Sequence, residues 1–162
     1  SMPVCSSRAL SRMSAKLLPV RVSFLVMVRT RWPYRTDEVK AHAGRLQEGD
    51  IIFIRTDLDR LFRTDRWMDQ SYLAEEAMDW LISLKPRVIG TDAGGFEVPG
   101  TDYQPNHMKM FQNGIAMVES ATNLAAIGRE RVMVFILALP IEGIDACPVR
   151  IVALGEENGS DE

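Results

Sequence analysis

His107 and Glu119 lie twelve residues apart, and their side chains could bind a metal ion together. Imidazole and carboxylate groups are common ligands of zinc and manganese, and such an ion generates hydroxide from water near neutral pH. The spacing also allows a structural interpretation, in which a nearby carbonyl satisfies the histidine and the glutamate serves the N-terminus of the next helix. Both interpretations stay open, because a catalytic zinc normally has three protein ligands and this pair supplies two.

A short helix and a strand must position this pair in the stretch from Pro105 to Glu119. Asn106 can cap the helix, His107 lies in its first turn, and Gly114 ends it. The apolar run that follows predicts a buried strand up to Glu119. The two candidate ligands then lie at opposite ends of a helix-then-strand hairpin.

Strand and helix patterns alternate along the rest of the chain, which predicts the α/β class. Apolar, β-branched runs predict strands, and amphipathic stripes that end at Gly or Pro predict helices. The expected strands cover residues 20–28, 51–54, 88–92, 115–119, 132–139 and 149–154, and the expected helices begin at Thr36, Ser71, Asn106 and Ser120 or Thr122. The 51–54 strand should be covered on both faces, and the 132–139 strand should be central.

The composition is typical of one soluble globular domain with neither a nucleic-acid nor a membrane partner. The chain has 162 residues, of which 46% are hydrophobic and 25% charged, and its net charge is −3. The apolar run at 20–28 is too short to cross a membrane. Cys5 and Cys147 lie far apart in unlike settings, which favours free thiols in a reducing compartment.

Charge divides the chain into three parts. Residues 1–35 contain seven Lys or Arg and no acid, so we interpret them as a basic leader, either a mitochondrial-type transit peptide or the remnant of an upstream region. Residues 36–154 are expected to form the domain, and residues 155–162 an acidic, solvated tail. The expected localisation is cytoplasmic, and the leader makes the mitochondrion the alternative.

Several short segments carry a resemblance to a known family. They are Gly49 to Thr56, Val88 to Asp92, Asn106-His107, Val118-Glu119 with Asn123-Leu124, and Pro148 to Arg150 with Ala153-Leu154. In order and with compatible gaps, they resemble the cyclase family of metal-dependent hydrolases, which includes bacterial kynurenine formamidase and isatin hydrolase. The resemblance covers roughly residues 36–154. It implies a swivelling β/β/α-type fold, one or two zinc or manganese ions, and hydrolysis of a small-molecule amide or cyclic imide. It also implies that His107 and Glu119 descend from metal ligands.

One part of the family pattern is missing. The signature His-x-x-x-His-x-Asp-x-Pro, which supplies most of the family's metal ligands, is absent, and the two histidines of the chain are His42 and His107. The chain therefore resembles the C-terminal half of a cyclase-family protein, with the N-terminal half of the fold incomplete. We expect weak metal binding and impaired hydrolysis. Catalytic and substrate-binding residues stay unassigned, and Asp92 and Asp102 are the first acids to test if turnover is found.

Two other functions stay open. The chain could be a non-catalytic binding or oligomerisation module, such as a pseudoenzyme or a truncated isoform, or it could be a marginally stable fragment. A homo-oligomer is expected, because a half-domain exposes the apolar strands 20–28 and 132–139 as edges that pair with another chain. We interpret His42 as a half-buried packing residue, since no Asp, Glu or Cys lies near it at a ligand-like spacing on the core face.

Overall fold

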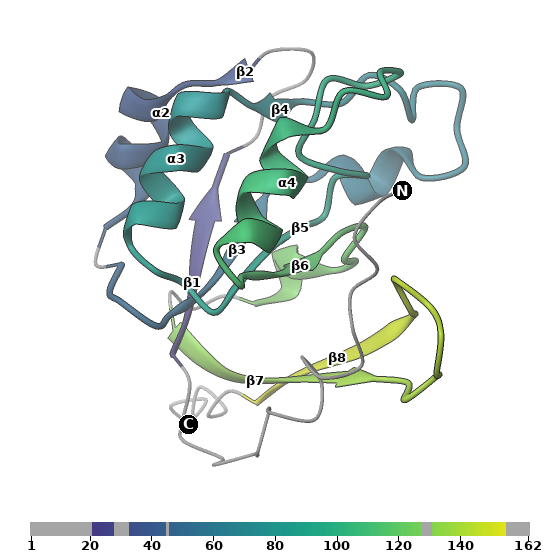
Figure 1. Ribbon diagram of the computed structural model, residues 1–162. Coiled ribbons are helices and arrows are strands. Elements are labelled where there is room, and N and C mark those ends of the chain that lie inside the picture. Colours follow the sequence, from purple (N-terminus) through teal and green to yellow (C-terminus); the bar gives the residue numbers. More distant parts are fainter. Residues whose placement is uncertain (1–20, 28–32, 45, 128–130, 155–162) are drawn as a thin grey trace, which may run out of the picture.

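A mixed six-stranded sheet forms the centre of the computed structural model, which describes residues 21–27, 33–44, 46–127 and 131–154. Its strands are β1 (Arg21–Val26), β3 (Ile51–Arg55), β5 (Val88–Thr91), β6 (Ala116–Val118), β7 (Arg131–Ala138) and β8 (Val149–Leu154). The strand order is β6-β5-β3-β1-β7-β8 (Figure 1). The first four strands of this order are parallel, and β7 and β8 extend the sheet in antiparallel pairing.

Three helices pack on one face of this sheet (Figure 1). They are α2 (Thr36–His42), α3 (Glu75–Ser83) and α4 (Pro105–Gln112), and two single 3₁₀ turns are η1 (Leu58–Leu61) and η2 (Leu124–Ala126). A separate pair of short parallel strands, β2 (Pro33–Tyr34) and β4 (Tyr72–Leu73), lies beside the helices. The larger core cluster fills the space beneath the helices and includes Leu25, Val39, Ile52, Met78, Leu81, Ile89 and Met110.

The opposite face of the sheet carries a second, smaller core cluster. Its buried members are Val22, Ile51, Phe53, Val118, Ala121 and Leu124, against which partly buried residues of β1, β7 and β8 pack. Only glycine fits at position 90 of β5, because a Cβ there would lie 2.4 Å from the ring of Phe53. Apolar side chains on both faces of β3 confirm the expectation that the 51–54 strand is covered on both sides.

The α/β class is confirmed, but the two strands expected as open edges are not edges. β1 lies between β3 and β7, and β7 lies between β1 and β8, because the two apolar runs pair with each other. The outermost strands of the sheet are β6 and β8. Because β1 precedes residue 36, the sheet also extends across the domain boundary that the charge pattern suggested.

The helix expected from Thr36 begins there, but the other helix starts and the capping residues differ from those expected. α3 begins at Glu75, not at Ser71, because Tyr72 and Leu73 pair with β2 as a strand. α2 has Arg35 as its N-cap, whose backbone N–H donates to the Glu38 carboxylate at 3.1 Å. In α4 the N-cap is Gln104 and Pro105 opens the first turn, so Asn106 lies inside the helix and does not cap it.

Some expectations fall on residues outside the described ranges. These are the basic leader up to residue 20, including Cys5, and the acidic tail at 155–162. No helix within the described ranges is long and apolar enough to cross a membrane. Cys147 is a free, partly exposed thiol.

Candidate functional site

His107 lies between two carboxylates in the first turn of α4. Its Nδ1 is 3.0 Å from Glu97 Oε1, and its Nε2 is 3.2 Å from Glu119 Oε1. Its backbone N–H also donates to Glu97 Oε1 at 2.9 Å. The structure therefore brings together the two residues that the sequence selected and adds a third, Glu97, to the same group.

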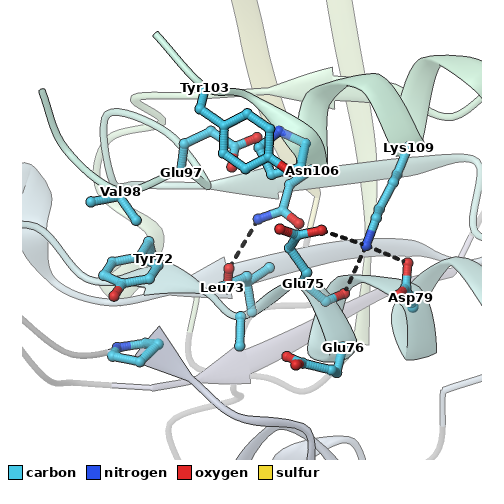
Figure 2. Close-up of a pocket in the computed structure, with 13 residues that line it drawn as sticks. Tyr72, Leu73, Glu75, Glu76, Asp79, Glu97, Val98, Tyr103, Asn106 and Lys109 are labelled. Atoms are coloured by element: carbon cyan, nitrogen blue, oxygen red, sulfur yellow. Dashed lines mark hydrogen bonds and ion pairs between the residues drawn. The ribbon is translucent and has the colours of Figure 1, made fainter. Parts of the chain in front are cut away.

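Asn106 fixes the start of α4 and with it the place of His107. It is buried, and its Nδ2 donates to the carbonyl oxygens of Leu73 at 2.9 Å and Phe96 at 3.0 Å. Figure 2 shows the Asn106 side chain reaching from α4 to Leu73 in β4. These two hydrogen bonds tie the first turn of the helix to β4 and to the loop that carries Glu97.

Glu119 directly follows β6 and reaches His107 past a glycine. A Cβ at Gly95 would lie 3.1 Å from Glu119 Oε1, so the glycine leaves the space that this carboxylate occupies. Glu119 Oε1 is buried and has no hydrogen-bond partner within the described part of the chain, although His107 Nε2 is near enough for an ion pair.

The electrostatic setting favours the protonated imidazole. The contact with Glu119 raises the pKa of His107 above its ordinary value, burial opposes the rise, and Glu97 adds to it. Nδ1–H can donate to Glu97, which leaves Nε2 on the side of Glu119. A neutral imidazole held by a carboxylate in this way is the arrangement found behind many metal ions in proteins.

The donor atoms fit part of a metal site and not all of it. His107 Nε2 and the buried Glu119 Oε1 lie 3.2 Å apart, a separation that suits two ligands of one divalent ion. Across the described ranges, however, no group of three or more His, Cys, Asp or Glu side chains could hold a metal ion. Two donors are fewer than the three protein ligands of a typical catalytic zinc.

The two acids singled out for further testing lie apart from this group. Asp92 is buried and accepts hydrogen bonds from Thr56 N at 2.7 Å, Thr56 Oγ1 at 2.6 Å and Asp57 N at 2.9 Å. Burial raises its pKa, and these three donors oppose the rise. Asp92 thus holds the turn after β3, while Asp102 is exposed in the loop before α4.

His42 is also away from the site. It is exposed at the end of α2, where its Nδ1 lies 2.8 Å from the Glu38 carbonyl oxygen, so the expected half-buried packing role is wrong. Sequence reasoning missed Glu97 and Gly95, and it gave Asn106 a capping role in place of its bonds to Leu73 and Phe96. Their contacts depend on how the loop between β5 and α4 folds back over about ten residues. The Gly94-Gly95 pair in that loop is the sequence signal that could have indicated a close approach of another side chain to the backbone.

The comparisons with known proteins cover part of the chain, and the family match ends before His107. The Cyclase family model matches residues 13–98, just over half of the 162 residues. The chain belongs to the cyclase family. A comparison with curated proteins gives no match. The family match begins before β1, which agrees with the place of β1 inside the sheet.

Solved structures show that this cyclase-family chain has the fold of longer proteins. A potential metal-dependent hydrolase with cyclase activity is 24% identical with a TM-score of 0.68, over 83% of this chain and 64% of that one. A predicted metal-dependent hydrolase from Bacillus stearothermophilus is 23% identical with a TM-score of 0.69, over 83% and 62%. An isatin hydrolase bound to the product analogue thioisatinate is 17% identical with a TM-score of 0.70, over 83% and 60%. The chain thus spans less than two thirds of the length of these proteins.

Proposed function

We propose that this chain forms part of a metal-dependent hydrolase that opens an amide or cyclic imide bond in a small molecule. His107 and Glu119 are two ligands of its zinc or manganese ion. The observation that carries the proposal is the geometry of His107, whose Nδ1 is held by Glu97 while its Nε2 lies 3.2 Å from the buried Oε1 of Glu119. Family membership supports the reaction class.

The residues of the chain would have the following roles. His107 and Glu119 hold the ion, which when bound polarises a carbonyl and lowers the pKa of water. Glu97 fixes the ring orientation of His107 and accepts its Nδ1–H. Gly95 leaves the room that the Glu119 carboxylate needs. The ring of Phe111 meets the imidazole edge-on at 6.3 Å and shields it on one side.

We further propose that the ligand set is completed by another polypeptide region, since the family signature with its histidines is missing from the sequence. With two ligands the isolated chain binds zinc or manganese weakly and retains well under one equivalent after dialysis. It hydrolyses N-formylkynurenine, isatin or simple cyclic imides no faster than buffer. The isatin hydrolase among the structural relatives supports this choice of substrates.

A second candidate is a non-catalytic binding or oligomerisation module. It is favoured by the observation that no group of three metal-binding side chains occurs in the described ranges. The two candidates differ in whether an added chain that carries the His-x-x-x-His-x-Asp signature restores metal binding and turnover.

The test is metal analysis together with progress curves, with zinc or manganese added, in the presence and absence of such a complementing chain. We expect turnover only with the complementing chain, and its loss in Glu119→Gln and His107→Ala. His42→Ala is the matched control, because His42 is exposed and away from the site. No metal uptake and no turnover with the complementing chain would favour the non-catalytic module. Turnover by the isolated chain would contradict the incomplete site.

A further inference from the structure

Ser120, which directly follows the candidate ligand Glu119, has a left-handed backbone conformation with a φ of 54°. This conformation is uncommon for residues that carry a Cβ, and asparagine and aspartate adopt it more readily than serine does. Ser120 is exposed, so its own side chain gains nothing from packing that would hold the backbone in this state. The conformation must therefore be imposed by the chain on either side of it.

Two successive backbone N–H groups hold this turn against the end of β5. Ser120 N donates to the Ala93 carbonyl oxygen at 2.8 Å, and Ala121 N donates to the Thr91 carbonyl oxygen at 3.0 Å. The later donor reaches the earlier acceptor, which is the reverse of the order in a parallel ladder such as that of β5 and β6. The regular pairing of β6 therefore ends at Ser120, where the chain changes direction.

The change of direction decides which side of the sheet each neighbouring side chain faces. In a continued strand Glu119 and Ala121 would face the same side, because side chains alternate along a strand. In the structure Ala121 is instead buried with Val118 in the smaller core cluster. Glu119 reaches His107 on α4, which packs on the opposite face of the sheet (Figure 1). The left-handed residue between them lets both neighbours keep these places.

We propose that Ser120 is a positioning residue, whose left-handed backbone turns Glu119 toward His107 while Ala121 stays in the core. Unfavourable backbone conformations persist where the surrounding structure fixes them, and they occur often at functional sites. The inference deepens the proposed function and rests on it for the purpose of the contact, which is to hold two ligands of one ion. The contact itself forms without metal, so it can be measured separately from metal binding.

Three substitutions separate positioning from stability. Ser120→Val disfavours the left-handed conformation because valine is β-branched, and Ser120→Asn favours it. Asn123→Val is the matched control, because Asn123 is also exposed and left-handed, with a φ of 62°, and its N–H bonds Asp59 in η1. Both valine variants should raise the equilibrium constant of unfolding about fivefold or more. Ser120→Asn should lower this constant.

The first measurement is the coupling between His107 and Glu119, obtained from urea unfolding of the metal-free 162-residue chain at pH 6. His107→Gln and Glu119→Gln, alone and together, form a double-mutant cycle in each background. In the wild type and in Asn123→Val we expect a coupling of about threefold or more in the unfolding constant. Ser120→Val should lose most of this coupling, and Ser120→Asn should keep it. A purely structural role would lower stability and leave the coupling unchanged.

The second measurement is zinc titration of the protein together with its complementing chain. Ser120→Val should bind zinc about tenfold more weakly than the wild type, whereas Asn123→Val should bind it equally well. Loss of the coupling in Ser120→Val without zinc uptake by any variant would support the positioning role and contradict the proposed metal site.

Several outcomes would overturn the proposal. They are a coupling that is absent from the wild type, a coupling that is equal in Ser120→Val and the wild type, and an equal loss of coupling in Asn123→Val. Ser120→Asn keeps the test decisive if Ser120→Val does not fold. A Ser120→Asn variant that is less stable than the wild type, or that loses the coupling, would also overturn the proposal.

Discussion

At the scale of single residues, Glu97 determines which nitrogen of His107 faces Glu119. One of its oxygens accepts from both the backbone N–H and Nδ1 of the histidine. In Glu97→Gln the charge is lost while the shape is kept, so we expect the pKa of His107 to fall and zinc affinity to drop about 10- to 100-fold. NMR titration of the two histidines measures the first effect, with His42 as internal control. An unchanged or higher pKa of His107 would contradict this role.

The pKa of His107 also predicts how stability depends on pH. Because the pKa is raised in the folded chain above the ordinary value of 6.5, the stabilisation is fully present below about pH 6.5. It is lost as the pH rises through the higher folded pKa. Urea unfolding should therefore show a larger stability difference between the wild type and His107→Gln at pH 6 than at pH 8.

Metal binding should follow the opposite trend, since the ion competes with the proton for Nε2. Zinc uptake by the complemented protein is expected to increase between pH 6 and pH 8. A stability difference between wild type and His107→Gln that grows toward pH 8 would show that the two carboxylates do not favour the proton.

At the scale of elements, the loop between β5 and α4 brings the site together through close approach. In Gly95→Ala the new methyl group would lie 3.1 Å from Glu119 Oε1, so the carboxylate must move by a few tenths of an ångström. We expect metal affinity to fall several-fold with little change in the free energy of unfolding. Metal titration and urea unfolding of the same variant separate the two effects, and equal losses in both would indicate a structural role only.

The end of β5 stabilises the turn after β3 through Asp92. Asp92→Ala removes the acceptor of two backbone N–H groups and one hydroxyl, so the free energy of unfolding should fall by about 2–3 kcal/mol. Asp102→Ala is the matched control and should stay within about 0.5 kcal/mol of the wild type, because Asp102 is exposed. A stable Asp92→Ala variant that loses metal would instead assign this acid to the site.

Sequence patterns predicted the strands well, because apolar runs such as Ile51–Ile54 report burial directly. They also selected His107 and Glu119 from residue type and spacing. They could not find Glu97, since its contact with His107 depends on where a loop returns in space. They misplaced the start of α3, since the pairing of Tyr72 with β2 is a tertiary contact that overrides local helix preference.

At the scale of the whole molecule, the hairpin of β7 and β8 exposes one apolar face. Side chains alternate along the strands, and those that point away from the smaller core cluster include Met133 at 44%, Leu137 at 55% and Leu154 at 54% exposure. Such a face favours association. We expect a dimer or larger oligomer by light scattering at micromolar concentration, and a shift to the monomer in Leu137→Glu. A monodisperse wild-type monomer would contradict it.

The position of β1 inside the sheet also limits how early the chain can complete its sheet during synthesis. Val22 pairs with Ile51 on one side and with Val132 on the other, and this second partner is 110 residues further along the chain. At a synthesis rate of roughly 5–20 residues per second, Val132 leaves the ribosome about 6–22 s after Val22. During that interval one backbone edge of β1 has no β7 to pair with, so a nascent chain that ends before β7 offers a strand edge to chaperones.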